Sequence, residues 1–232
     1  MRQPLHYMGM SRREVFVPEG DARQDRKVEG SVVPLPEIPL PPRPWLTSSK
    51  FADALNVAAR IFADKTKKGT NIPYISHLLG TCAIALEHGA TEDEAIAALL
   101  HDTIEDIKPT DEARAAVGHF GKEVLRIVEA CSDSDTHPKP PWQERKERYL
   151  DRLAREDHAV LLVSASDKLH NARAIVTDLR HQGSSVWDRF NAPREKQLWY
   201  YRELVKIFSE NLVENPALVA ELDLAVTEME RP

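Results

Sequence analysis

Apolar residues recur every three to four positions along most of the chain after residue 46, which is the period of an amphipathic α-helix. The segment SSKFADALNVAARIFADKT, for example, places Phe51, Leu55 and Phe62 near one face. The same pattern predicts further helices over residues 74–89, 91–106, 110–121, 121–132, 142–156, 194–211 and 215–230, and one long helix or a helix pair over 158–183. No long stretch alternates with period two. We therefore predict an all-α helical bundle.

The start of one predicted helix carries a specific capping signal. Thr91 precedes an apolar run, and Glu94 follows three residues later. This spacing is the signature of a capping box, in which the two side chains satisfy backbone N–H groups at the helix start.

Proline is concentrated before the helical region. Eight of the 16 prolines precede Trp45, and the stretch VVPLPEIPLPPRPW suits neither a helix nor an inner strand, because proline lacks an amide hydrogen and fixes φ. We therefore predict a tail over residues 1–45 that is disordered or extended like polyproline, and one helical domain over residues 46–232. The tail is passive, or it packs onto the body or a partner through Leu35, Ile38, Leu40 and Trp45.

Composition narrows the functional class. Mean hydropathy is −0.44, and neither a membrane span nor a secretory signal is predicted. Cys82 and Cys131 both lie in apolar helical patterns, which favours buried thiols and a reducing cytoplasm over disulfides. The formal charge of −6 argues against binding to polymeric nucleic acid, so a phosphorylated ligand would need a local basic patch or a cation. A homo-oligomer is compatible with the sequence.

Ionisable residues end the apolar run in AIAALLHDTIED. His101 and Asp102 are adjacent in the sequence. The side chains of adjacent helical residues point in directions about 100° apart, but both can still reach one ion at the rim of the helix. Glu105 and Asp106 follow at i+4, so that all four side chains can face one cavity. Imidazole and carboxylate together suit manganese, iron, zinc or a similar ion.

Two more ligands have to come from other helices. His77 lies on an apolar helical face beside Leu78, and Asp167 lies between the segments LLVSAS and KLHNAR. Each has an ordinary alternative, since His77 can be a satisfied core histidine and Asp167 can pair with Lys168 or Arg173. The acids after His101 can be solvated, although acids near a helix C-terminus oppose the helix dipole. The combined order, H…HD…D among helices, favours a metal site.

The segments KKGTNIPYISHLLG, AIAALLHDTIED, FGKEVLRIVEACSD and SASDKLHNAR resemble the HD-domain metal-dependent phosphohydrolases. The resemblance is strongest to the hydrolase domain of RelA/SpoT-type alarmone enzymes and to stand-alone small alarmone hydrolases of the metazoan SpoT type. It spans roughly residues 50–210. It implies a divalent metal, normally manganese, held by His77, His101, Asp102 and Asp167. It also implies that Glu105 and Asp106 handle the attacking water, and that Asn171 contacts the nucleoside.

The implied substrate is a nucleotide with a 3′-diphosphate, a polyanion whose charge a divalent ion would offset. Lys65, Lys67 and Lys68 form a basic cluster at a loop where family members also carry basic residues, and they are candidates for phosphate or base contacts. The same cluster can be a solvated charge run. Arg173 is a further phosphate candidate, with a salt bridge as its alternative role.

The chain departs from the family pattern at three places. Leu78 follows His77 where the family often has proline, the loop KKGTNIP is one residue longer than the commoner loop, and Ala174 stands where a threonine is frequent. These differences leave the metal ligands intact but leave the choice between guanine and adenine open.

The leading hypothesis is a manganese-dependent hydrolase that removes the 3′-diphosphate of guanosine or adenosine tetra- or pentaphosphate alarmones and releases pyrophosphate. One alternative is another phosphohydrolase on the same scaffold, such as a nucleotidase or an NADPH phosphatase. The other is a non-catalytic helical module that binds a nucleotide or a partner.

Overall fold

A computed structural model describes residues 14–16, 32–34, 49–134 and 138–231 of the chain. The chain divides into two compact units, Met1–Arg43 and Pro44–Pro232. In the first unit, strand β1 (Glu14–Phe16) pairs antiparallel with strand β2 (Val32–Pro34). Both strands are edges, and edge strands tolerate a proline such as Pro34. The other residues of the tail predicted over 1–45, and the predicted boundary at residues 45 and 46, lie outside the described residues.

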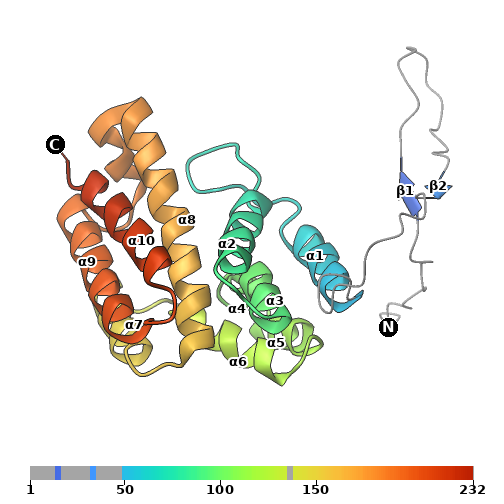
Figure 1. The fold of residues 1–232 in the computed structure, drawn as a ribbon. Coiled ribbons are helices and arrows are strands. Elements are labelled where there is room, and N and C mark those ends of the chain that lie inside the picture. The colour runs from blue at the N-terminus through green and yellow to red at the C-terminus, as the bar shows by residue number, and fades with distance from the viewer. Residues whose placement is uncertain (1–13, 17–31, 35–48, 135–137, 232) are drawn as a thin grey trace, which may run out of the picture. The chain divides into compact units, whose positions relative to one another are not determined.

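The second unit is helical (Figure 1). Its helices are α1 (Ser49–Ile61), α2 (Ile75–Glu87), α3 (Glu92–Leu100), α4 (Thr103–Asp106), α5 (Thr110–Gly118), α6 (Lys122–Cys131), α7 (Trp142–Leu153), α8 (His158–Gln182), α9 (Arg194–Asn211) and α10 (Pro216–Met229), with a 3₁₀ segment η1 (Gly183–Arg189) after α8. The predicted all-α bundle is confirmed.

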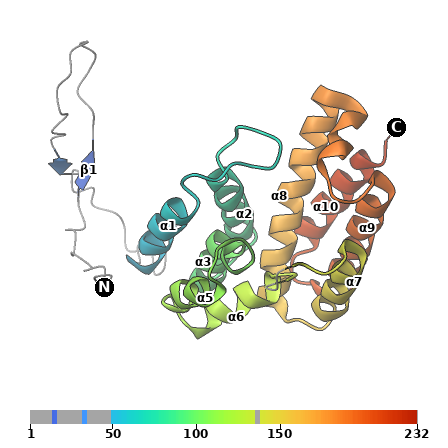
Figure 2. The ribbon, with the colours of Figure 1, turned by 180° about the vertical axis from the view of Figure 1, so that it is seen from behind.

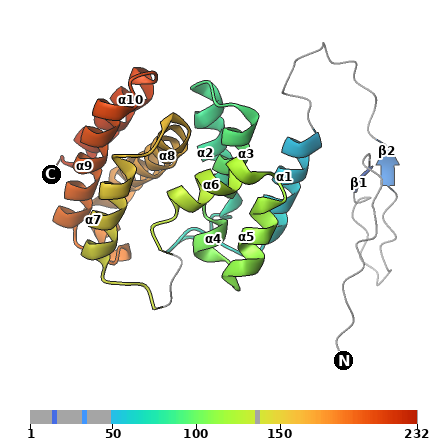
Figure 3. The same ribbon diagram turned by 90° about the horizontal axis from the view of Figure 1, so that it is seen from below.

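Helix α8 is the central element of this unit. It packs against α2, α3 and α6 on one side and against α9 and α10 on the other, as Figures 1 and 2 show from opposite sides. The view from below in Figure 3 places α7 with α9 and α10, across α8 from α1 to α6. Residues Val160 to Asp167 of α8 are all buried, because neighbours cover this helix on both sides.

The capping box at the start of α3 forms as predicted. The Oγ1 atom of Thr91 accepts a hydrogen bond from the Glu94 backbone N–H at 3.4 Å, and the Glu94 carboxylate accepts one from the Thr91 backbone N–H at 2.6 Å. Every residue from Glu94 to Leu100 is buried. The cap therefore fixes the start of a helix whose far end carries the His-Asp doublet.

The prediction of one continuous helix over residues 91–106 is wrong at one point. Helix α3 ends at Leu100 and α4 begins at Thr103, so that His101 and Asp102 lie in a turn. Asp102 has φ −90° and ψ −3°, in the bridge region between helix and strand geometries, where many active-site residues lie. The turn lets two adjacent side chains reach a common point.

Both cysteines are free thiols in the described part of the chain. Cys82 is buried as predicted, whereas Cys131 at the end of α6 is only partly buried. Among the described residues, no helix combines the length and the apolar character that a membrane crossing requires.

Candidate metal centre and active site

Four predicted ligands from three parts of the chain meet beside α8. His77 comes from the first turn of α2, His101 and Asp102 from the turn after α3, and Asp167 from the middle of α8. The Nε2 atoms of His77 and His101 lie 3.2 Å apart. The Asp102 carboxylate lies 3.5 Å and 3.2 Å from these two atoms, and the Asp167 carboxylate lies 3.2 Å and 3.6 Å from them.

This spacing fits a single bound cation. Two ligand atoms that each lie about 2.1 Å from one ion, at roughly right angles or tetrahedral angles, are about 3.0 to 3.4 Å apart. His77, His101 and Asp102 form a group whose ligand atoms all lie within 4.8 Å of one another. Nitrogen and carboxylate donors together suit a first-row divalent ion. The site can therefore hold a divalent metal.

Further contacts orient the two imidazole rings. Nδ1 of His101 lies 2.9 Å from the carbonyl oxygen of Ala98, so its Nδ1–H donates to that oxygen and its Nε2 carries the free lone pair. Nδ1 of His77 lies 2.9 Å from Nδ1 of His170 on α8. When Nε2 of His77 binds an ion, its Nδ1–H donates to His170, which is then the acceptor.

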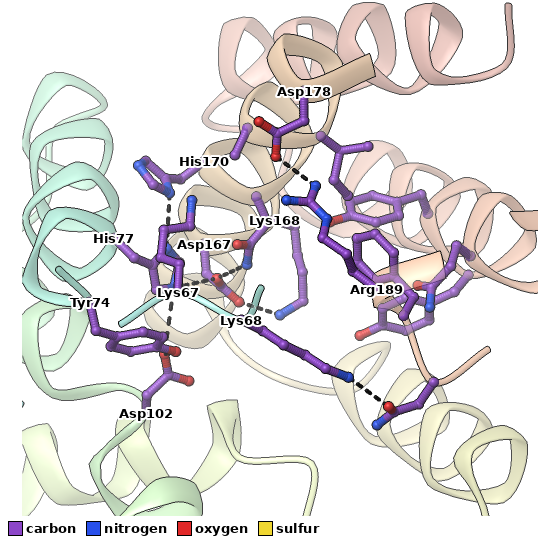
Figure 4. Close-up of a pocket in the computed structure, with 18 of the residues that line it drawn as sticks. Lys67, Lys68, Tyr74, His77, Asp102, Asp167, Lys168, His170, Asp178 and Arg189 are labelled. Carbon is purple, nitrogen blue, oxygen red and sulfur yellow. Dashed lines mark hydrogen bonds and ion pairs between the residues drawn. The ribbon is translucent and has the colours of Figure 1, made fainter. Parts of the chain in front are cut away.

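The two carboxylates are also held. The Tyr74 hydroxyl donates to Oδ2 of Asp102 at 2.5 Å, and the Asn171 side-chain amide donates to Oδ1 of Asp167 at 2.6 Å. Lys168 pairs with the other oxygen of Asp167. The ion pair of Asp167 with Lys168 is therefore formed by Oδ2 (Figure 4), while Oδ1 faces His77 and His101.

Burial and opposite charges act against each other in this cluster. Burial alone would lower the pKa of His101, but the neighbouring carboxylates of Asp102 and Asp167 raise it well above its ordinary value. Burial likewise opposes ionisation of Asp102, yet the two histidines bring its pKa well below the usual range. Both carboxylates are thus anionic, and a divalent ion would replace the protons that balance their charge.

The acidic pair after the doublet is partly buried, and each member has a lysine partner. Glu105 accepts from Lys139 at 2.5 Å, and Asp106 pairs with Lys65. Burial raises the pKa of Glu105, and the nearby charges of Asp133 and Asp102 raise it further against the effect of Lys139. Burial raises the pKa of Asp106 as well, and the negative charge of Asp102 raises it further.

A cavity of about 830 Å³ opens beside the four predicted ligands, within the size range of small-molecule sites. Among the predicted site residues, those that line it are His77, Asp102, Glu105, Asp167, Lys67, Lys68, Asn171 and Arg173. Lys65 and Asp106 pair with one another outside that lining, and the Lys65 ammonium lies 3.9 Å from the centre of the Tyr74 ring. His101 is buried behind the cavity wall.

Like Lys65 and Asn171, two more of the predicted substrate contacts have protein partners. Arg173 pairs with Glu221 on α10, so its salt-bridge alternative is realised although it lines the cavity. The Lys68 ammonium donates to the side-chain oxygen of Asn191 at 2.7 Å.

The sequence interpretation missed several side chains that shape the site. Tyr74 precedes His77 by one helical turn, and His170 follows Asp167 by one turn, so i,i+3 spacing could have revealed both. Lys139 and Arg189 line the cavity from segments without a comparable signal.

The fold and this site together define a class of protein. Residues 54–197 match the HD domain family, and the chain belongs to it. Structurally it is similar to a metazoan ortholog of SpoT that hydrolyses ppGpp and plays a role in starvation responses, with a TM-score of 0.63 and 26% identity over 79% of this chain and 97% of that one. It is also similar to the protein lmo0812 from Listeria monocytogenes, with a TM-score of 0.56 and 26% identity over 65% of this chain and 96% of that one.

Other relatives match a shorter part of the chain at higher identity. The guanosine-3′,5′-bis(diphosphate) 3′-pyrophosphohydrolase MESH1 of Xenopus tropicalis is 38% identical over 124 residues, which cover 52% of this chain and 66% of the relative. The human protein of the same name is 35% identical over 130 residues, which cover 54% of this chain and 69% of the relative. The predicted resemblance to HD-domain alarmone hydrolases is confirmed.

Proposed function

We propose that the chain is a metal-dependent hydrolase that removes the 3′-diphosphate from a guanosine or adenosine alarmone and releases pyrophosphate. The observation that carries the proposal is the set of four ligand atoms from His77, His101, Asp102 and Asp167, spaced for one ion at the wall of a cationic cavity. Relatives named for this activity are 38% and 35% identical to the chain over 124 and 130 residues, which supports the proposal.

The chemistry divides between the ion and the protein. A divalent ion, when bound, offsets phosphate charge and makes water a stronger nucleophile near neutral pH. Glu105 lines the cavity three residues after Asp102, and its raised pKa suits a base that accepts a proton from the attacking water. Asp106 pairs with Lys65 outside the cavity lining, next to Glu105 in the chain.

Substrate contacts come from two walls of the cavity. Lys67 and Lys68 lie on the loop before α2, and Asn171 and Arg173 lie on α8. We assign phosphate contacts to the three cations and the nucleoside contact to Asn171. Ala174 adjoins them on α8 and leaves room at the nucleoside, which fits a site that takes guanine or adenine.

Manganese is the proposed ion, because mixed imidazole and carboxylate ligands accept it readily. We also propose that the enzyme acts in the cytoplasm. We propose neither polymeric nucleic acid nor a membrane as a partner, and a homo-oligomer remains compatible with the proposal. The proposed domain limits are a proline-rich tail over residues 1–45 and the hydrolase domain over residues 46–232.

The test is a product analysis. Purified chain with Mn²⁺ is incubated with guanosine and adenosine 3′,5′-bis(diphosphate), and pyrophosphate and orthophosphate are measured separately. We expect the wild-type chain to release pyrophosphate. We expect Asp102→Asn to reduce kcat by more than about 100-fold, because loss of a metal ligand has a larger effect than loss of a residue that only orients a ligand. The exposed Asp151 on α7 provides the control variant Asp151→Asn, which keeps wild-type activity.

Other outcomes would overturn the proposal. Release of orthophosphate alone would indicate a nucleotidase or an NADPH phosphatase. Tight nucleotide binding without turnover, with Mn²⁺, Fe²⁺ and Zn²⁺ alike, would indicate a non-catalytic binding module.

A further inference from the structure

The cavity extends well beyond the metal ligands along α8. Asp167, Asn171, Ala174 and Asp178 follow one another at intervals of four, three and four residues, and all line the cavity. Such spacing places them on one face of the helix, and the rise of about 1.5 Å per residue separates Asp167 from Asp178 by roughly 16 Å. The end at Asp178 is therefore a part of the cavity distinct from the metal end.

Positive charge exceeds negative charge at this distal end. Lys67 and Arg189 line it, and Asp178 is the only carboxylate among the described residues that line this end. The Arg189 guanidinium donates to Asp178 at 2.6 Å, whereas Lys68 bonds to the uncharged Asn191 (Figure 4). Two cations, Lys67 and Arg189, thus face one acid, while Lys68 lies farther along the same cavity.

The environment of Lys67 reflects this imbalance. Burial lowers the pKa of Lys67, and the positive charge of Arg189 lowers it further, while Asp178 acts in the opposite direction. Within the described residues, no carboxylate lies close enough to Lys67 to form an ion pair. An anion at this end would relieve the repulsion between the lysine and the arginine.

The fold holds these cations in place. Gly69 has φ +74°, and a Cβ added there would lie 2.9 Å from Cδ of Arg189, so the loop backbone packs directly on the arginine stem. Lys68 reaches across to Asn191, 123 residues away in the sequence. The loop before α2 and the segment after α8 therefore meet at this end of the cavity and present their charges together.

We propose that this distal end is a subsite for the 5′-phosphate chain of the nucleotide, with Arg189 as its main contact and Asp178 as the group that orients Arg189. The inference rests on the proposed function, in which the 3′-diphosphate lies at the metal end. Guanidinium groups bind phosphate through paired hydrogen bonds, and a polyanionic chain balances the excess cations here. An uncharged nucleobase at the same place would leave that excess uncompensated.

Kinetics with a graded substrate series tests the subsite. The substrates share a nucleoside 3′-diphosphate and carry a 5′-hydroxyl, monophosphate, diphosphate or triphosphate. We expect the wild-type kcat/KM to rise with the number of 5′-phosphates. We expect Arg189→Gln to reduce kcat/KM about tenfold for the 5′-diphosphate, mainly through KM, and to leave the 5′-hydroxyl substrate within about twofold.

Two further variants separate charge from packing. Arg189→Lys keeps the positive charge, and we expect it to recover part of the preference for 5′-phosphates. Arg180 on α8 is exposed, pairs with Glu228 and does not line the cavity, so Arg180→Gln is the matched control and behaves as wild type. An unchanged preference in Arg189→Gln, or an equal loss on the 5′-hydroxyl substrate, overturns the subsite.

A binding measurement separates this inference from the proposed hydrolysis. Calorimetric titration of the full chain with GDP, ADP and guanosine needs no turnover. We expect GDP and ADP to bind more tightly than guanosine, and Arg189→Gln to remove that difference. If the difference is present but no pyrophosphate forms, the subsite stands and the proposed hydrolysis fails. If pyrophosphate forms but GDP and guanosine bind equally, the hydrolysis stands and the subsite fails.

Discussion

Gly80 on α2 lies directly against His170 of α8, beside the predicted metal ligands. A Cβ added at Gly80 would lie 2.2 Å from both Cδ2 and Nε2 of His170, the ring that contacts Nδ1 of His77 at 2.9 Å. Ordinary contacts between carbon atoms are about 3.5 to 4.0 Å long, so Gly80→Ala has to displace the His170 ring by more than about 1 Å. The imidazole ring of His170 moves as one body, so we expect this displacement to break the 2.9 Å contact between its Nδ1 and Nδ1 of His77.

The expected effects have distinct magnitudes. Inserting one methyl group into a packed contact lowers the free energy of unfolding by about 1–3 kcal/mol. Loss of the group that orients a metal-binding histidine weakens metal affinity by about 10- to 100-fold. Mn²⁺ affinity is measured by titration calorimetry, and stability by urea denaturation of the metal-free protein.

Two companion variants make the interpretation specific. Gly118→Ala on α5 is the control, since its added Cβ meets its nearest atom, Cδ2 of Leu125, at an ordinary 3.5 Å. In the double variant Gly80→Ala/His170→Ala the clash is gone, so stability recovers while Mn²⁺ affinity stays low. Wild-type Mn²⁺ affinity in Gly80→Ala, or recovery of that affinity in the double variant, would refute the orienting role of His170.

Three further predictions concern the cap, the proposed base and the core. Thr91→Ala removes the capping box of α3 and lowers the free energy of unfolding by about 1 kcal/mol, and an unchanged urea midpoint would contradict this. Lys139→Gln removes a positive charge that lowers the pKa of Glu105, so we expect this pKa to rise. The acid limb of the kcat/KM profile against pH should then move to higher pH. An unmoved limb would exclude Glu105 as the base. Phe208→Ala on α9 empties a fully buried site and lowers the free energy of unfolding by about 3–5 kcal/mol, whereas a loss below 1 kcal/mol would show that the core refills the space.

Sequence patterns predicted the helices well because each has its own apolar period, and some also have local end signals. The capping box at Thr91 is an example, since it depends on residues only three positions apart. The break at His101 and Asp102 is different. The segment reads as one amphipathic helix, and the turn is fixed by contacts with other helices, such as the hydrogen bond from Tyr74 to Asp102.

The metal end of the site was predictable because ionisable residues on apolar helical faces are unusual. The distal end was not, because it depends on how the loop before α2 meets the segment after α8. Nothing in the sequence around Arg189 indicates that it contacts Gly69 or pairs with Asp178 across the cavity. Lysines 65, 67 and 68 look equivalent in the sequence, yet Lys65 pairs with Asp106 and only the other two line the cavity.

The central claim is that three segments of the chain close around one divalent ion. Anomalous diffraction from crystals grown with Mn²⁺ tests it most directly, because it locates the ion without reference to activity. The account predicts one strong peak within bonding distance of Nε2 of His77, Nε2 of His101, and the carboxylates of Asp102 and Asp167. A peak elsewhere, or none at this site in crystals with saturating Mn²⁺, would contradict it.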